Sequence, residues 1–522
     1  MALADYYSRA AVAAAQVIAG FDEEAFRGAL ETACVGISFD RDAAETREGQ
    51  TLLNLAVRLL ARLYPTIALQ PAPGAEVFVE QLTSLAKAIN PNLTVAENAG
   101  VGIAVGCNAP AFDRTIFAGS RGWTATLSCK TPQAVGDGPI PFGAGATACL
   151  AAAVVFRIVL LDDVEAPADV TFSCLDGVDP VPEPAIPDDG WCLPEPTVLV
   201  GCGAVGQAAV WALARSPLRG ELFLVDGELI ELGNMQRYVL TTRQDEDAAK
   251  TDLAADNITN ALNPRAHPGD WASFTTAYGH RWAAVLTALD SAAHRRAVQA
   301  ALPQWIANAW TQPGDLGVST HAFLTDACLA CLYIPTGPGP NEDAIVANAL
   351  GIPDRAADVR TLLHTGAPTP AALLDVIGTG LGVSRDRLDA FEGKPIRKVY
   401  VDGVCGGAVL PLGRAGTPRQ DVHVPLAHQS ALAGVLLAAR LVRMAAGADT
   451  GRTEITRLNI LRNPGEQPTQ YALKDPRGIC ICQDADYQDV YTDKWAPPTK
   501  PGSPSPDRGP YAARPASRQM GP

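Results

Sequence analysis

The chain has 522 residues, 48% of them hydrophobic and 19% charged, so it can bury more than one core and we expect two large domains with insertions. Its 41 basic and 56 acidic residues give a net charge of -15. This balance argues against nucleic acid as a partner and against attachment to an anionic membrane surface.

Neither of two apolar stretches predicts a signal peptide or a membrane span. Residues 10–20 follow Asp5 rather than a basic leader, and residues 430–439 cover about half the length needed to cross a bilayer. The 12 cysteines are unevenly spaced apart from two close pairs, which does not indicate a disulfide framework. We therefore expect a cytoplasmic protein.

The first domain is expected over residues 1–175. It begins with helices rich in small residues and continues with β-type runs and an alanine-rich helix. The expected strands are 102–107, 114–118 and 122–127, and the helix is 143–161. Residues 176–196 are acidic and crowded with proline, which predicts an exposed linker.

From residue 197 onward, expected strands alternate with expected helices. The strands are 197–200, 221–225 and 284–289, and the helices are 207–215 and 248–262. Strands separated by helices of this length indicate a parallel, doubly wound sheet. The fold class is therefore α/β, with a Rossmann-like domain whose first part is 197–335.

The rest of the chain divides into three parts. Residues 336–420 are expected to hold a helical insertion, a short strand at 398–401 and a crossover segment. The second domain then resumes over 421–495 with a long helix at 425–445, and 496–522, with almost nothing apolar, is expected to be a disordered tail.

Two helices suggest an internal repeat. The helices at 143–161 and 425–445 are both rich in alanine and leucine, and each lies near the end of an α/β half. We expect a pseudo-dimer of two diverged copies, although composition alone is an alternative explanation. Only the second copy has a glycine-rich turn, so the first would lack a nucleotide site.

That turn is formed by Gly201, Gly203 and Gly206, spaced as Gly-x-Gly-x-x-Gly directly after a strand. Glycine lets the backbone turn tightly and approach nucleotide phosphates at a helix N-terminus. Asp226 follows Gly206 by 20 residues, where a carboxylate can accept a hydrogen bond from a ribose hydroxyl. A structural turn with a chance carboxylate is the alternative, and the coincidence of features favours a nucleotide site.

Charged residues after Asp226 indicate which nucleotide chemistry is expected. Asn234, Arg237 and Lys250 follow in order, and Asp290 ends a later strand on the carboxyl edge of the sheet. Hydride transfer needs no cationic cluster beside the ribose. Attack on the α-phosphorus of a triphosphate does, because charge builds on the departing pyrophosphate and must be met by cations, including a magnesium ion held by a carboxylate.

These residues resemble the activating-enzyme superfamily of ubiquitin-like and sulfur-carrier proteins (ThiF/MoeB type). In that family a strand-ending aspartate is followed by Asn-x-x-Arg and a lysine, and Asp290 with Arg295 is similar to its later Asp and Arg pair. Tyr238 stands where the family usually has glutamine, and Ser291 where asparagine is common. The resemblance covers about 197–331 and 421–445 and implies an adenylation domain.

The resemblance also implies roles for single residues. Asp226 would bind the ribose of ATP, and Asp290 would coordinate magnesium. Asn234, Arg237 and Lys250 would contact the phosphates.

Two close cysteine pairs offer ligands for one tetrahedral zinc ion. Cys328 and Cys331 form Cys-x-x-Cys, and Cys480 and Cys482 form Cys-x-Cys further along the chain. Redox chemistry at the first pair and plain buried cysteines are the alternatives. Members of the family often carry a four-cysteine site, which would here tie the carboxyl segment to the main domain.

Cys405 is the candidate nucleophile. Its glycine-rich surroundings leave the backbone open to a bulky acyl adenylate. The resemblance implies a catalytic cysteine in the segment before the last large helix; a small buried residue is the alternative, and no activating base is evident. Cys202, inside the glycine turn, is expected to pack, and His423 and His428 receive no role.

The predicted function is ATP-dependent activation of a ubiquitin-like protein. Its terminal carboxylate would be adenylated, captured as a thioester on Cys405 and passed to a conjugating enzyme. The closest resemblance is to activating enzymes of bacterial ubiquitin-like conjugation operons, some of them antiphage (Bil-type). The alternatives are a sulfur-carrier protein adenylyltransferase, a nicotinamide-dependent oxidoreductase and a non-catalytic scaffold, and a homodimer is left open.

Overall fold

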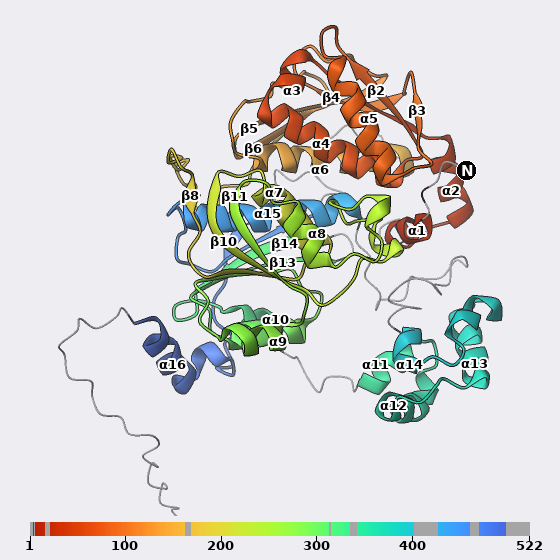
Figure 1. The fold of residues 1–522 in the computed structure, drawn as a ribbon, viewed down its shortest axis with the longest axis vertical. Helices are drawn as coiled ribbons and strands as arrows, with labels where there is room; N and C mark the ends of the chain where they lie inside the picture. The colour runs from red at the N-terminus through yellow and green to blue at the C-terminus, as the bar shows by residue number, and fades with distance from the viewer. Residues whose placement is uncertain are drawn as a thin grey trace, which may run out of the picture.

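The computed structural model describes residues 4, 6–15, 21–161, 169–312, 315–334, 342–400, 426–459 and 469–496. These residues form two large β-sheets with helices between them, and a separate group of helices (Figure 1). The predicted α/β, doubly wound fold class is confirmed.

The first sheet has seven strands in the order β3-β2-β1-β4-β5-β6-β7. The five strands from β3 to β5 run parallel, and β6 and β7 are antiparallel to their neighbours. The strands are β1 (Cys34–Phe39), β2 (Thr66–Pro71), β3 (Thr94–Ala96), β4 (Val101–Val105), β5 (Arg114–Arg121), β6 (Thr124–Ser128) and β7 (Val170–Ser173). The helices of this half are α1 (Tyr7–Ala15), α2 (Glu23–Thr32), α3 (Arg41–Glu45), α4 (Arg47–Leu63), α5 (Val77–Ile89) and α6 (Phe142–Leu160).

The second sheet has the order β11-β10-β9-β12-β13-β14-β15-β16, with β8 added beside β10. Strands β11 to β13 run parallel, and β14, β15 and β16 are antiparallel. The strands are β8 (Trp191–Cys192), β9 (Thr197–Val200), β10 (Leu218–Val225), β11 (Ala261–His267), β12 (Ala284–Thr287), β13 (Trp305–Gln312), β14 (Asp315–His321), β15 (Glu454–Leu458) and β16 (Thr469–Tyr471). The helices of this half are α7 (Ala204–Leu213), α8 (Lys250–Asp256), α9 (Trp271–Tyr278), α10 (Ala292–Ala300), α15 (Ala427–Ala445) and α16 (Ala485–Trp495).

The two sheets repeat one topology. In each, the five parallel strands have the relative order third, second, first, fourth, fifth, and antiparallel strands follow, two in the first sheet and three in the second. In each, the connection between the first two antiparallel strands contains a long helix, α6 between β6 and β7 and α15 between β14 and β15. This is the pattern that duplication of one unit would produce.

The helices α4, α6, α7 and α15 pack together between the sheets (Figure 1). A Cβ at Gly434 would lie 2.3 Å from the carbonyl oxygen of Val205, so glycine lets α15 approach α7 this closely. Residues 142–156 of helix α6 are all buried and, apart from Thr147, apolar, as expected for a helix surrounded by protein. It is long and apolar enough to cross a membrane, but 78% of its most apolar window is buried inside the protein.

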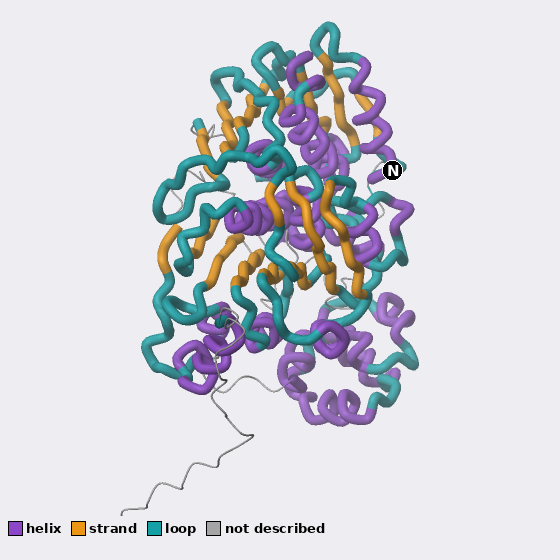
Figure 2. The backbone as a smooth tube through the Cα atoms, turned by 60° about the vertical axis from the view of Figure 1, so that its left-hand side comes forward, coloured by secondary structure: helices purple, strands orange, loops and turns teal. Residues whose placement is uncertain are grey.

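The helical insertion has its own hydrophobic core and lies apart from both sheets (Figures 1 and 2). Its helices are α11 (Glu342–Ala349), α12 (Ala356–Thr365), α13 (Ala371–Leu381) and α14 (Ile396–Lys398). The predicted strand at 398–401 is wrong, because residues 396–400 are helical. Ile396 and Val399 are both buried in that core, and a spacing of three residues places them on one face of a helix.

Two other predicted elements need correction. The helix expected over 248–262 ends at Asp256, and β11 begins at Ala261, because β10 offers a parallel partner that single-sequence reasoning does not reveal. The linker is exposed in its middle, as predicted, but its ends pack: the Val178 amide donates to Glu454 at 3.4 Å, and Trp191 is buried in β8.

Candidate active site

The glycine turn between β9 and α7 requires glycine at two positions. Gly201 has a φ of +94°, and a Cβ there would lie 2.5 Å from the carbonyl oxygen of Ala288. A Cβ at Gly206 would lie 2.0 Å from the carbonyl oxygen of Gly201. The turn therefore brings the start of α7, with its unpaired backbone N–H groups, to the edge of the sheet, where phosphates can be bound.

Asp226 follows β10 and is fixed against this turn. Its Oδ2 accepts a hydrogen bond from the Cys202 amide at 2.7 Å, and its Oδ1 accepts one from the Glu228 amide at 2.9 Å. Burial raises the pKa of Asp226, and the charge of Lys250 opposes this effect. The Cys202 thiol is buried, and burial raises its pKa well above the usual value, as expected for a packing residue.

Lys250 is a buried cation at the first turn of α8. Its ammonium forms an ion pair with the carboxylate of Glu228 and lies 5.3 Å from the centre of the Tyr238 ring. Burial lowers the pKa of Lys250, but Tyr238, Asp226 and Glu228 together outweigh burial and raise it. The side chain therefore stays charged beside Asp226.

Tyr238 connects the cations to the glycine turn. Its hydroxyl lies 3.4 Å from the position that a Cβ of Gly203 would take. The guanidinium carbon of Arg237 is 5.5 Å from its ring centre. In the sequence Tyr238 stands out only as a departure from the family's pattern, whereas in the structure it lies between the turn and Lys250.

Asn234 ends a short 3-10 helix, η1 (Leu232–Asn234). Its side-chain oxygen accepts a hydrogen bond from the Glu231 backbone amide at 3.0 Å. The side-chain NH2 group is then the part of Asn234 that can donate to a ligand. The next cation, Arg237, donates to the Gly233 carbonyl at 3.5 Å. Both side chains are therefore held close to the backbone turn that carries them.

Asp290 lies just beyond β12 and is exposed. Arg295 fixes the loop before Asp290: it donates to the carbonyl of Leu289 in that loop and, at 3.3 Å, to the carbonyl of Ala309 in β13. The Leu289 side chain is 3.3 Å from the position that a Cβ of Gly201 would take, so this loop adjoins the glycine turn.

These segments follow three neighbouring parallel strands. The glycine turn follows β9, Asp226 follows β10, and the Asp290 loop follows β12. The carboxyl ends of parallel strands meet at one edge of the sheet, which is the ligand-binding edge of doubly wound folds. Magnesium prefers carboxylate oxygen and keeps several waters, so an exposed aspartate such as Asp290 suits it.

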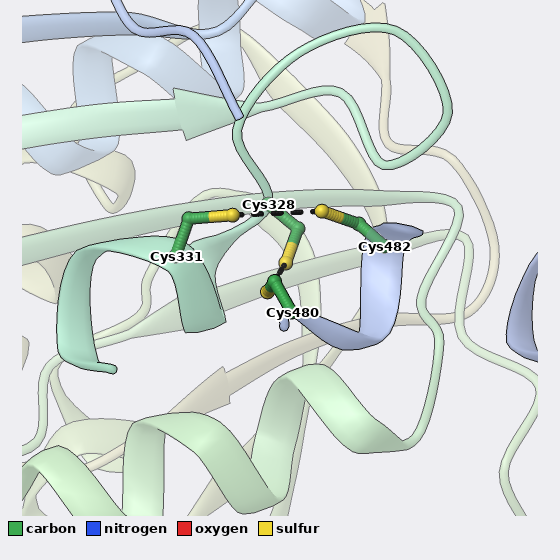
Figure 3. Close-up of side chains that lie close together, drawn as sticks. All are labelled: Cys328, Cys331, Cys480 and Cys482. Atoms are coloured by element: carbon green, nitrogen blue, oxygen red, sulfur yellow. Dashed lines mark hydrogen bonds between the residues drawn. The ribbon is translucent and has the colours of Figure 1, made fainter. Parts of the chain in front are cut away.

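The four predicted zinc ligands come together (Figure 3). Their sulfur atoms all lie within 4.8 Å of one another, with Cys328 Sγ 3.4 Å from Cys480 Sγ and Cys331 Sγ 3.5 Å from Cys482 Sγ. Zinc with Zn–S bonds of about 2.3 Å would set tetrahedral sulfurs about 3.8 Å apart. Hydrogen bonding from Cys328, and then from Cys331 and Cys480, lowers the pKa of Cys482, which favours a thiolate in the cluster.

We predict that Cys482→Ser removes bound zinc. Elemental analysis should find about one zinc per chain before the change and close to none after it, because three thiolates bind far less tightly than four. Limited proteolysis should then cut near α16, which the cluster ties to the main domain. Cys192→Ser, an exposed thiol away from the cluster, is the control and should keep the metal; full zinc retention in Cys482→Ser would contradict the assignment.

Cys405 and His423 lie outside the described residues. His428, at the start of α15, is buried 5.7 Å from the Phe156 ring, and burial lowers its pKa to about 3. It is therefore neutral at physiological pH, in keeping with the absence of an assigned role.

Two family models match the chain. The model described as the ThiF family matches residues 196–478, a range that includes the glycine turn, Asp226, Asn234, Arg237, Lys250 and Asp290. The model described as Prokaryotic E2 family C matches residues 38–161, inside the first half. The chain is also 42% identical over 514 residues to a protein called "Uncharacterized protein y4jF" from Sinorhizobium fredii, covering 96% of this chain and 99% of that protein.

Solved structures show a weaker similarity. The Escherichia coli protein MccB, crystallised with MccA-N7isoASN, is 13% identical with a TM-score of 0.35, over 54% of this chain and 65% of MccB. MccB alone is also 13% identical, with a TM-score of 0.34, over 54% of this chain and 63% of MccB. The chain thus spans just under two thirds of the length of MccB.

Proposed function

The chain belongs to the ThiF family, and from this membership we propose that it activates a ubiquitin-like protein by adenylating the C-terminal carboxylate of that protein. Activity of the ThiF adenylyltransferase type is supported by the family itself, and it implies ATP and magnesium. The identity of the acyl substrate as a ubiquitin-like protein is the proposal.

The observation that carries the proposal is the placement of Asp226, Lys250 and Asp290 beside one glycine turn. We assign the ATP ribose to Asp226 and the phosphates to Asn234, Arg237, Lys250 and the start of α7. A carboxylate oxygen of the substrate attacks the α-phosphorus, the bond from that phosphorus to the bridging oxygen breaks, and pyrophosphate leaves. Magnesium held at Asp290 would supply further positive charge to the departing pyrophosphate.

The second step assigned to this chain is capture of the acyl group by Cys405. The thiolate attacks the acyl carbon of the mixed anhydride, a thioester forms, and AMP leaves. A conjugating enzyme would then accept the acyl group. The proposed setting is a bacterial ubiquitin-like conjugation operon in the reducing cytoplasm, of the kind that includes antiphage systems.

We propose that the first half is an adenylation-like domain without a nucleotide site. The repeated strand order supports this proposal. So does Asp40, which follows β1 where the second half has its glycine turn: its carboxylate accepts from the amides of Ala43 and Asn108, both at 2.9 Å. A Cβ at Gly106 would lie 2.2 Å from that carboxylate, so the corresponding space is filled by the protein.

The match of residues 38–161 to a family described as prokaryotic E2 favours a second candidate function for this half. It would receive the activated protein within the same chain, on a cysteine of its own. Of the three cysteines in that range, Cys107, two residues beyond β4, is exposed, Cys129 is half-buried and Cys149 is buried.

Non-reducing gels test both proposals. The protein is incubated with ATP, magnesium and a small ubiquitin-like protein encoded beside it. We expect an ATP-dependent adduct that thiols release and that Cys405→Ala abolishes. An adduct that survives Cys405→Ala and is lost in Cys107→Ala would favour the second candidate, and no ATP-dependent adduct would contradict the thioester step.

A further inference from the structure

Two arginines of the first half reach into the second. Arg58 and Arg62 lie one turn apart on α4. Arg58 Nη1 donates to the carbonyls of Val239 at 2.7 Å and Leu240 at 3.3 Å, and Arg62 Nη2 donates to the carbonyl of Thr241 at 2.6 Å. Each contact joins residues about 180 positions apart in sequence.

We infer that Arg58 and Arg62 are positioning residues for the adenylation site, an inference that rests on the function proposed above. They hold residues 234–241, the phosphate segment, in the conformation that presents Asn234 and Arg237 to ATP. The first half would thereby contribute to a nucleotide site that it does not itself contain.

Backbone hydrogen bonds connect the clamped end of the phosphate segment to its functional end. The Thr241 amide donates to the carbonyl of Tyr238 at 3.1 Å. The amides of Tyr238 and Arg237 donate to the carbonyl of Asn234 at 3.2 and 3.1 Å. A shift at Thr241 is therefore passed through two linked turns to the residues assigned to the phosphates.

The second half holds the same segment by a different group. The Leu240 amide donates to Gln207 Oε1 at 3.3 Å, and Gln207 lies on α7 directly behind the glycine turn. The second half thus binds the Leu240 amide, and the first half binds the carbonyls of residues 239–241. Buried carbonyls need donors, so loss of the arginines would leave these oxygens to find others.

Burying the charged side chains of Arg58 and Arg62 costs free energy, which favours a positioning role over simple packing. Burial, followed by the charges of Arg62 and Arg215, lowers the pKa of Arg58 to about 9, and burial also lowers that of Arg62. Arg58 and Arg215 share Asn54 Oδ1 as an acceptor, at 3.1 and 3.3 Å. Apolar side chains would stabilise a mere packing interface more readily, whereas the planar fork of arginine fixes several acceptors in one geometry.

The inference is tested with the full-length variants Arg62→Met, Arg62→Lys and Arg58→Gln. The matched control is Arg215→Met, because Arg215 shares the acceptor Asn54 with Arg58 but donates to Trp211 and Asn54 rather than to the phosphate segment. Hydrogen–deuterium exchange is measured over residues 232–242, ATP binding by calorimetry, and ATP–pyrophosphate exchange with the ubiquitin-like protein.

We expect Arg62→Met to speed amide exchange in the phosphate segment and to raise the KM for ATP by about tenfold, the effect of losing a hydrogen bond from a charged group. Arg62→Lys should recover part of the loss. Arg215→Met should lower the melting temperature while the KM for ATP and the exchange of residues 232–242 stay unchanged.

A folded Arg62→Met protein with unchanged exchange in the phosphate segment and unchanged ATP affinity would overturn the inference. If Arg62→Met does not fold, the same two measurements on Arg58→Gln decide the question. Arg58 is half-buried, so its replacement should disturb the packing less than that of the buried Arg62. Hydrogen exchange requires no activity. A wild-type protein that activates no ubiquitin-like protein would therefore end the proposed function, while the exchange rates would still decide the role of the two arginines.

Discussion

Replacing Lys250 with alanine should lower ATP–pyrophosphate exchange by about 10²–10³-fold, the cost of removing one preorganised group that meets charge in a transition state. The lysine is buried, stays charged and sits between Asp226, Glu228 and Tyr238. In that position it can pair with phosphate oxygens once ATP replaces Glu228 as its partner. Single-turnover formation of AMP measures the loss directly.

Lys87→Ala is the matched control, because Lys87 is an exposed lysine on α5 in the first half. It removes the same charge from the chain and should leave the rate unchanged. Lys250→Arg should retain part of the activity, because the charge remains while its geometry changes. If Lys250→Ala formed AMP at the wild-type rate, the phosphates would have to bind elsewhere.

Asp290→Ala should lower AMP formation by about 10²-fold or more and shift the magnesium requirement to higher concentration. The carboxylate is exposed, so the melting temperature should not change. Rates measured across a magnesium titration separate a lost metal ligand from a damaged fold.

The control for that change is Asp42→Ala, which removes an exposed carboxylate from α3 in the first half. Asp290→Asn should fall between the wild type and Asp290→Ala, because an amide oxygen is a weaker ligand for magnesium. An Asp290→Ala protein with an unaltered magnesium dependence would remove Asp290 from the metal site.

The alternative functions make different predictions. A sulfur-carrier adenylyltransferase would exchange pyrophosphate but form no thioester on Cys405. A nicotinamide oxidoreductase would show cofactor absorbance after purification, and the buried cation at Lys250 argues against it. A non-catalytic scaffold would bind ATP without exchanging pyrophosphate.

Local patterns in the sequence predicted the geometry at the centre of the candidate site. The glycine spacing requires one backbone geometry, and the structure shows Asp226 bonded to the Cys202 amide inside that turn. The two cysteine pairs likewise come together, although they are far apart in sequence. In both cases a short spacing already encodes the local geometry.

The residues that sequence reasoning missed depend on contacts between distant segments. Tyr238 becomes a candidate site residue only because the fold places it beside Gly203 and Lys250. Arg58 and Arg62 contact a loop of the other half, and no local pattern distinguishes them from ordinary arginines of an amphipathic helix.

The same cause explains the errors in secondary structure. Strand β11 has a polar, exposed face and includes Pro264, so it has little local strand signal and is defined by pairing with β10. In the insertion, residues 396–400 resemble a short strand in composition. Packing of Ile396 and Val399 into the insertion's core makes them helical.

The most direct test of the account is ATP–pyrophosphate exchange by the wild-type protein with magnesium, with and without a ubiquitin-like protein encoded beside it. We expect labelled pyrophosphate to enter ATP only when that protein is present with an intact C-terminus. Exchange that ignores the C-terminal carboxylate, or no exchange with any such protein, would contradict it.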